Sequence, residues 1–148
     1  MLRLDYGKEV SGLALPDAVL KFLQEPNLAV LATVGPGGRP QATPVWFLFD
    51  NDHILINTSK GRLKLRNMQA NPRVAVTVLD PKDPYRYVQI QGKVVKFDPE
   101  GGARDIERLS QRYRGQSYRY APTNKPEDRI SVIIKPVRVS ALGTRRPL

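Results

Sequence analysis

Six β-rich runs separated by tight turns constrain the fold of this 148-residue chain more than any other feature. Gly35-Pro36-Gly37-Gly38 and Asp50-Asn51-Asp52 are turn sequences, so the first three runs are predicted to form an antiparallel meander. Six strands with few helices favour a barrel, because closure of the sheet removes exposed edges. The predicted strands are 28–34, 39–49, 53–58, 73–79, 85–97 and 129–142.

Three helices are predicted, one before the first of these runs and two between later runs. Pro16 fits a first helical position and Glu25-Pro26 ends the segment, so the first helix covers about 16–24. The others cover about 61–70 and 103–113, whereas 114–128 has no clear period. The length suits a single domain over residues 1–148, mainly β with a few helices.

The second predicted strand is apolar on both faces. Val45, Phe47 and Phe49 alternate with Ala42, Pro44, Trp46 and Leu48. One face can fill a barrel, and the other must be covered by a ligand, by the protein's own helices or by a second subunit. The sequence leaves these three alternatives open.

Composition excludes several classes of chemistry. The chain has no cysteine, and His53 is its only histidine, so thiolate catalysis and histidine-based metal clusters are excluded. His53 directly follows the turn sequence Asp50-Asn51-Asp52, and we interpret it as a turn residue. No apolar run is long enough for a transmembrane helix, and MLRLDYGKEV lacks a signal-peptide core, so we expect a cytoplasmic protein without membrane insertion.

The charge of the chain indicates an anionic partner. The net charge is +10, and residues 57–148 carry all of this excess. Four cations, Lys60, Arg62, Lys64 and Arg66, lie close together at the expected start of a helix. Cations there oppose the helix dipole unless an anion is bound, and Thr58 and Ser59 are suited to capping that helix. The segment therefore predicts a phosphate site, and the alternative is a solvated basic helix face.

The combination of ATVGPGGRPQATPVWF, ILINTSKGRLKLRN, NPRVAV and YRYVQIQG resembles the flavin and deazaflavin oxidoreductase superfamily related to pyridoxamine 5′-phosphate oxidase. Its TPVW strand and RLKLRN helix start are most similar to the branch that uses the deazaflavin coenzyme F420. The resemblance implies a six-stranded antiparallel split β-barrel, a homodimer, and a cofactor in each of two grooves at the dimer interface. F420 is the implied cofactor and FMN the alternative.

The resemblance also implies roles for particular residues. Arg62 and Lys64 fall on phosphate-binding positions, with Asn57, Thr58, Ser59 and Lys60 at the adjoining strand end. Gln41, Thr43, Pro44, Val45 and Trp46 fall on the strand that lines the cofactor ring, and 85–92 on a strand near the groove. The arginine and lysine usual in vitamin oxidases are missing from 42–47, which weakens that activity and, less strongly, FMN.

The function implied is hydride transfer from reduced coenzyme to a conjugated acceptor such as a quinone, an enone or a tetrapyrrole. Such chemistry belongs to the cofactor, so no catalytic side chain or metal is expected from the protein. A basic nucleic-acid-binding domain is the alternative from another class, because Tyr113, Tyr118 and Tyr120 lie among Arg112, Arg114 and Arg119. We favour an ordered loop that packs on the barrel or on a partner subunit, or that borders the cofactor groove, and expect no specific nucleic-acid partner.

Overall fold

The structure is a computed structural model of the chain, and its described residues are 15–142. The stretch MLRLDYGKEV and the basic tail Arg145-Arg146 lie outside the described residues. The elements in chain order are α1 (Asp17–Gln24), β1 (Leu28–Val34), η1 (Pro36–Gly38), β2 (Pro40–Val45), β3 (Phe47–Asp50), β4 (His53–Ser59), α2 (Leu63–Ala70), β5 (Arg73–Asp80), β6 (Asp83–Asp98), α3 (Gly102–Arg114), η2 (Pro126–Asp128) and β7 (Arg129–Leu142).

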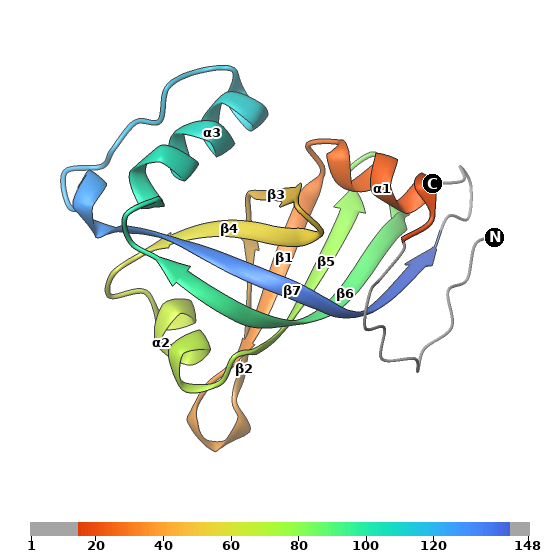
Figure 1. Cartoon of the computed structure of the whole chain (residues 1–148), viewed down its shortest axis with the longest axis horizontal. Helices are drawn as coiled ribbons and strands as arrows, with labels where there is room; N and C mark the ends of the chain where they lie inside the picture. Colours follow the sequence, from red (N-terminus) through yellow and green to blue (C-terminus); the bar gives the residue numbers. More distant parts are fainter. Residues whose placement is uncertain (1–14, 143–148) are drawn as a thin grey trace.

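The strands form one antiparallel sheet that curls into a split barrel (Figure 1). Their order is β2-β1-β5-β6-β7-β4-β3, so the two edge strands, β2 and β3, follow one another in the chain. Only Trp46 separates them. Across residues 15–142 the sheet therefore has seven strands, and the prediction of one continuous strand over 39–49 is wrong. The strand breaks because β2 pairs with β1, whereas β3 pairs with β4 at the opposite edge.

The barrel core fills with the side chains that alternate inward along the strands. Phe47, Phe49, Ile54 and Ile56 lie in this core, and Val45 packs against it, as the alternation in the second predicted strand requires. Helices α1 and α2 lie at opposite ends of the sheet (Figure 1). Each adds buried apolar residues to the same core, which are Val19, Phe22, Leu23, Leu65 and Met68.

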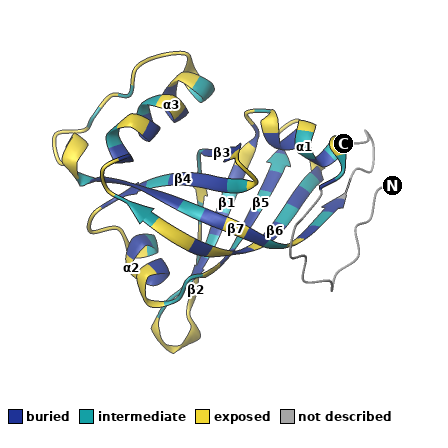
Figure 2. Ribbon diagram, in the orientation of Figure 1, coloured by how far each residue is buried: buried dark blue, intermediate teal, exposed yellow. Residues whose placement is uncertain are grey.

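Helix α3 covers the outer face of β4 and β7. Its buried side, shown in dark blue in Figure 2, contributes Ile106 and Leu109 to a second cluster with Leu55. Trp46 and Leu48, on the second apolar face of the predicted strand, pack against this cluster. Within the described chain, Trp46 and Leu48 are therefore covered by the protein's own helix and the loop after it, whereas Ala42 and Pro44 of the same face are exposed.

Arg112 and Tyr113 fix the end of α3 to the rest of the fold. The Arg112 guanidinium donates to the carbonyls of Leu23, Gln24 and Glu25 at 2.6–3.3 Å, which satisfies the C-terminal end of α1. The Tyr113 hydroxyl donates to the carbonyl of Asn27 at 2.8 Å. These contacts fix the C-terminal end of α3 against the end of α1 and the residues that lead into β1.

His53 is the first residue of β4 and closes the turn that joins β3 and β4. Asn51 and Asp52 have φ of 50° and 59°, the left-handed values that a two-residue hairpin turn requires. His53 Nδ1 lies 2.6 Å from the carbonyl oxygen of Asn51, so the interpretation as a turn residue is confirmed. No helix within residues 15–142 is both long and apolar enough to cross a membrane.

Candidate functional site

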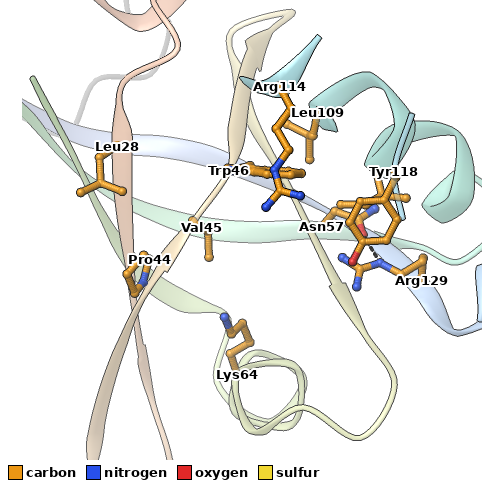
Figure 3. Close-up of a pocket in the computed structure, with 11 residues that line it drawn as sticks. Leu28, Pro44, Val45, Trp46, Asn57, Lys64, Leu109, Arg114, Tyr118 and Arg129 are labelled. Carbon is orange, nitrogen blue, oxygen red and sulfur yellow. Dashed lines mark hydrogen bonds between the residues drawn. The ribbon is translucent and has the colours of Figure 1, made fainter. Parts of the chain in front are cut away.

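A groove opens where β2 and β4 diverge below Trp46, with α2 across its lower end (Figure 3). We call it the β2–β4 groove, and its cavity volume is about 350 Å³. Pockets of this size bind small molecules and fragments of cofactors. The lining residues are Leu28, Pro44, Val45, Trp46, Asn57, Lys64, Ile106, Leu109, Arg114, Tyr118 and Arg129.

The charges that line the β2–β4 groove are all positive. Lys64, Arg114 and Arg129 are present, and no Asp or Glu is among the lining residues. Burial lowers the pKa of the Lys64 ammonium, and the charges of Arg62 and Arg129 lower it further. Burial also lowers the pKa of the Arg129 guanidinium. The groove thus holds cations that disfavour one another, an arrangement that an anionic ligand would relieve.

A chain of hydrogen bonds fixes Arg129 in the groove wall. Its Nε donates to Asn57 Oδ1 at 2.7 Å (Figure 3). The Asn57 amide donates in turn to the carbonyl of Gly102 at 2.8 Å and to Ser131 Oγ at 3.3 Å. The Ser131 hydroxyl donates to the buried carboxylate of Asp105 at 2.7 Å. The sheet pairing of β4 with β7 places Asn57 and Ser131 opposite each other, so the fold itself builds this chain.

Trp46 forms the aromatic wall of the groove. Its ring stacks on Tyr113 with centroids 5.5 Å apart, and meets Tyr118 edge-on at 6.4 Å. The Arg114 guanidinium lies 5.0 Å from the Trp46 ring centroid. Two tyrosines and a cation thus fix the orientation of the indole that lines the groove.

The structure brings some of the predicted site residues together and separates others. Pro44, Val45, Trp46, Asn57 and Lys64 line the β2–β4 groove. Six predicted residues are not among its lining residues: Gln41, Thr43, Thr58, Ser59, Lys60 and Arg62.

Two of these six lie on β2. Gln41 accepts a hydrogen bond from Thr33 Oγ1 at 3.2 Å, and Asn67 of α2 donates to the same hydroxyl. Thr43 Oγ1 is buried with no hydrogen-bond partner among the described residues. In the segment 85–92, no side chain lines the β2–β4 groove within one copy of the chain.

The helix-capping prediction is wrong. Helix α2 begins at Leu63 after Arg62, and no side chain caps it. Thr58 and Ser59 are instead buried in β4, where they pair with Ile130 and Arg129. Gly61 has φ of 87°, a left-handed conformation that separates β4 from the helix. The cations remain near the helix start, but the hydroxyls belong to the sheet.

No sequence signal points to Arg129. The sequence predicts that the segment holding Arg114 and Tyr118 packs on the barrel, borders the cofactor groove or binds nucleic acid, and both residues line the β2–β4 groove. Arg129 lies 72 residues after Asn57, and no local pattern connects the two. The tyrosines of the 112–120 segment pack on Trp46 and on each other, as an ordered loop on the barrel would.

Comparison with known proteins identifies the family. The family model for pyridoxamine 5′-phosphate oxidase matches residues 15–142, which is nearly all of the chain. The chain belongs to the pyridoxamine 5′-phosphate oxidase family. This assignment agrees with the split barrel and confirms the resemblance drawn from the sequence.

Three proteins similar to this chain carry different names for their activity or cofactor. A pyridoxine/pyridoxamine 5′-phosphate oxidase from Rubrobacter xylanophilus is 44% identical over 61 residues, 40% of this chain and 28% of that protein. A solved F420 reductase is 32% identical with a TM-score of 0.76, covering 85% of this chain and 98% of its own. An FAD-binding protein from Mesorhizobium loti shares the fold, at 21% identity and a TM-score of 0.62, with 85% and 93% covered.

The family and the relatives named above are oxidoreductase-like proteins. Among residues 15–142 there is no group of three or more His, Cys, Asp or Glu side chains that could hold a metal ion. The groove offers cations, amide and hydroxyl groups and an aromatic wall. These groups can bind and orient an anionic planar molecule.

Proposed function

We propose that this protein is an oxidoreductase that binds coenzyme F420 in the β2–β4 groove and transfers a hydride from reduced coenzyme to a conjugated acceptor. The observation that carries the proposal is the charge of the groove, which has three cations and no carboxylate beside the flat wall of Trp46. F420 combines a planar ring with a phosphodiester and a glutamate tail, so it matches this combination. The similarity to a solved F420 reductase supports the same choice.

The residues present fit such a coenzyme. Lys64 would bind the phosphodiester, with Arg62 adding positive charge at the start of α2. Pro44, Val45 and Trp46 would line the ring. When bound, the reduced deazaflavin supplies the hydride, and solvent supplies the proton that the acceptor also needs. The protein's part is to bind, orient and exclude water.

FMN is the alternative cofactor, and pyridoxine phosphate oxidation the corresponding activity. The family and its relative from Rubrobacter support that alternative. Against it, residues 42–47 carry no arginine or lysine, whereas the phosphodiester and the tail of F420 can use every cation of the groove. Quinones, enones and tetrapyrroles are the acceptor classes that we propose to test.

We also propose that the protein is a symmetric homodimer, the commonest oligomer geometry. The outer face of the sheet offers a surface of small side chains, where Ala42, Ala32 and Ala75 lie in one row across β2, β1 and β5. A cavity of about 740 Å³ lies on this face, between β1, β5, β6 and β7. No specific nucleic acid is proposed as a partner, and the proposed location is the cytoplasm.

The test is a binding titration that uses Trp46, the only tryptophan of the chain, as the fluorescent reporter. We expect F420 to quench Trp46 at lower concentration than FMN. The preference is expected to shrink as salt increases, because contacts between exposed charges are screened. Tighter binding of FMN at both low and high salt would transfer the proposal to FMN.

A further inference from the structure

Arg129 is a buried cation with no anionic partner. The residue is only 7% exposed, yet no Asp or Glu among residues 15–142 forms an ion pair with it. Its Nε donates to Asn57, and the guanidinium lies 5.4 Å from the Tyr118 ring centroid. Its two terminal nitrogens have no hydrogen-bond acceptor in the described part of the chain. In Figure 3 they point into the β2–β4 groove.

Arg86, the other buried arginine among residues 15–142, shows how a buried arginine is ordinarily compensated by carboxylates. Arg86 is 9% exposed and binds Glu25 at 3.1 Å and Asp80 at 3.3 Å. Buried charges are nearly always compensated in this way, because an unpaired one is costly. Arg129 lacks such compensation and has Lys64 as a positively charged neighbour. The missing negative charge is therefore expected from outside the chain.

We propose that Arg129 is an anion-binding residue of the β2–β4 groove, that it holds a phosphate or phosphodiester group together with Lys64, and that Asn57 positions its guanidinium. Asn57 occupies Nε only, which leaves both terminal nitrogens for two oxygens of one phosphate. The guanidinium is planar, so fixing Nε also fixes the direction of the terminal nitrogens. The identity of the phosphate carrier rests on the proposed function, whereas the anion site does not.

The residues behind Asn57 support this role without neutralising Arg129. Asp105 is the nearest carboxylate in the hydrogen-bonded chain, and its charge is already used. Arg104 donates to both of its oxygens at 3.0 Å, and Arg108 donates at 3.1 Å. Ser131 stands between Asp105 and Asn57. Asp105 thus anchors the position of Asn57 while its charge stays paired with surface arginines.

The experiment compares ligands with and without phosphate in five proteins: wild type, Arg129→Met, Asn57→Ala, the double variant Arg129→Met/Asn57→Ala, and Arg66→Gln. Arg66→Gln is the matched control, since it removes an exposed cation of α2 that does not line the groove. The probes are F420, the same deazaflavin without its phosphodiester, FMN, riboflavin and inorganic phosphate. Trp46 fluorescence reports binding of the first four, and protection against thermal unfolding reports phosphate.

We expect Arg129→Met to weaken binding of phosphate-bearing probes by roughly ten- to a hundredfold, the usual range for a charge-assisted contact. Binding of the phosphate-free partners is expected to change little. Asn57→Ala is expected to weaken the same probes less, and the double variant to bind like Arg129→Met alone, because Asn57 acts through Arg129. Without ligand, Arg129→Met is expected to unfold no earlier than wild type, since a costly buried charge has been removed.

The possible failures separate the two proposals. If Arg129→Met loses affinity equally for the probes with and without phosphate, or unfolds at a lower temperature than wild type without ligand, then Arg129 is a structural residue and this inference is overturned. Phosphate protection that depends on Arg129, with no binding of F420 or FMN, would support the anion site and refute the proposed function. Failure of wild type to respond to any of the five probes would refute both.

Discussion

Gly102 begins α3 at a point where the helix touches the backbone of β7. A Cβ added there would come closer to the carbonyl of Arg129 than real Cβ atoms come, and would lie 2.8 Å from the backbone nitrogen of Ile130. These are backbone atoms of a paired strand, so they cannot turn aside as a flexible side chain could. Gly102→Ala must therefore push α3 away from β7, where Arg129 and Asn57 form the groove wall.

Two effects of opposite sign decide the outcome of Gly102→Ala. Alanine is favoured over glycine within a helix by up to about 1 kcal/mol. Overpacking typically costs about 1–3 kcal/mol. Because the obstacle here is backbone, we expect a cost in the upper part of that range, which outweighs the gain in helix propensity. A net loss of about 1–2 kcal/mol lowers the melting temperature of a domain this size by roughly 2–8 °C.

The assay is calorimetric unfolding together with the F420 titration reported by Trp46. Gly102→Ala should lower both stability and affinity, because the Gly102 carbonyl accepts a hydrogen bond from Asn57. Gly37→Ala is the control, since Gly37 has φ of 71° and open space around its Cβ position in the β1–β2 turn. It should lose stability through backbone strain and keep its affinity. A Gly102→Ala protein that melts at or above wild type, with intact affinity, would refute the reasoning.

Three further predictions follow from the site and the sheet. Lys64→Ala should weaken F420 binding roughly ten- to a hundredfold, and Arg62→Ala should weaken it less, because only Lys64 lines the groove. If titrations give both variants the same affinity as wild type, the cations form a solvated basic face instead. The pKa of Lys64 is lowered in the folded protein, so the charged ammonium destabilises the fold below that pKa. The free energy of unfolding should therefore rise with pH between the lowered pKa of folded Lys64 and the ordinary pKa of lysine in the unfolded chain. F420 favours the charged form of Lys64, so the affinity of the protein for F420 should fall over the same pH window. Lys64→Arg stays protonated in that window, so its melting temperature and its F420 affinity should show neither pH dependence. Light scattering should show a dimer at micromolar concentration, and a stable monomer would refute the proposed homodimer.

The strands were predictable because they are encoded locally. Runs such as 73–79 are β-branched and are bounded by turn residues, and β5 and α3 match their predicted positions within one residue at each end. The break at Trp46 was not predictable, because no residue around it requires a turn. The chain changes its pairing partner there from β1 to β4, and that choice depends on how the whole sheet closes.

The site was predictable only in part, for a similar reason. Lys64 stands in a dense run of cations whose position at a helix start carries information. Thr58 and Ser59 were assigned to capping because their types suit it, but β7 pairs along the end of β4 and buries them. Arg129 gives no local signal, because it is one of several charged residues at the start of an apolar strand, directly after Glu127 and Asp128. Its importance comes from burial without a carboxylate, and burial is known only from the fold.

The most direct test of the central claim is a single-turnover experiment with reduced F420. The protein is mixed with reduced coenzyme and one acceptor from each class, a quinone, an enone and a tetrapyrrole, and formation of oxidised coenzyme is followed optically. The account predicts that at least one acceptor oxidises the coenzyme in a protein-dependent step that is slowed in Lys64→Ala. No protein-dependent oxidation with any acceptor, together with tighter binding of FMN than of F420, would contradict it.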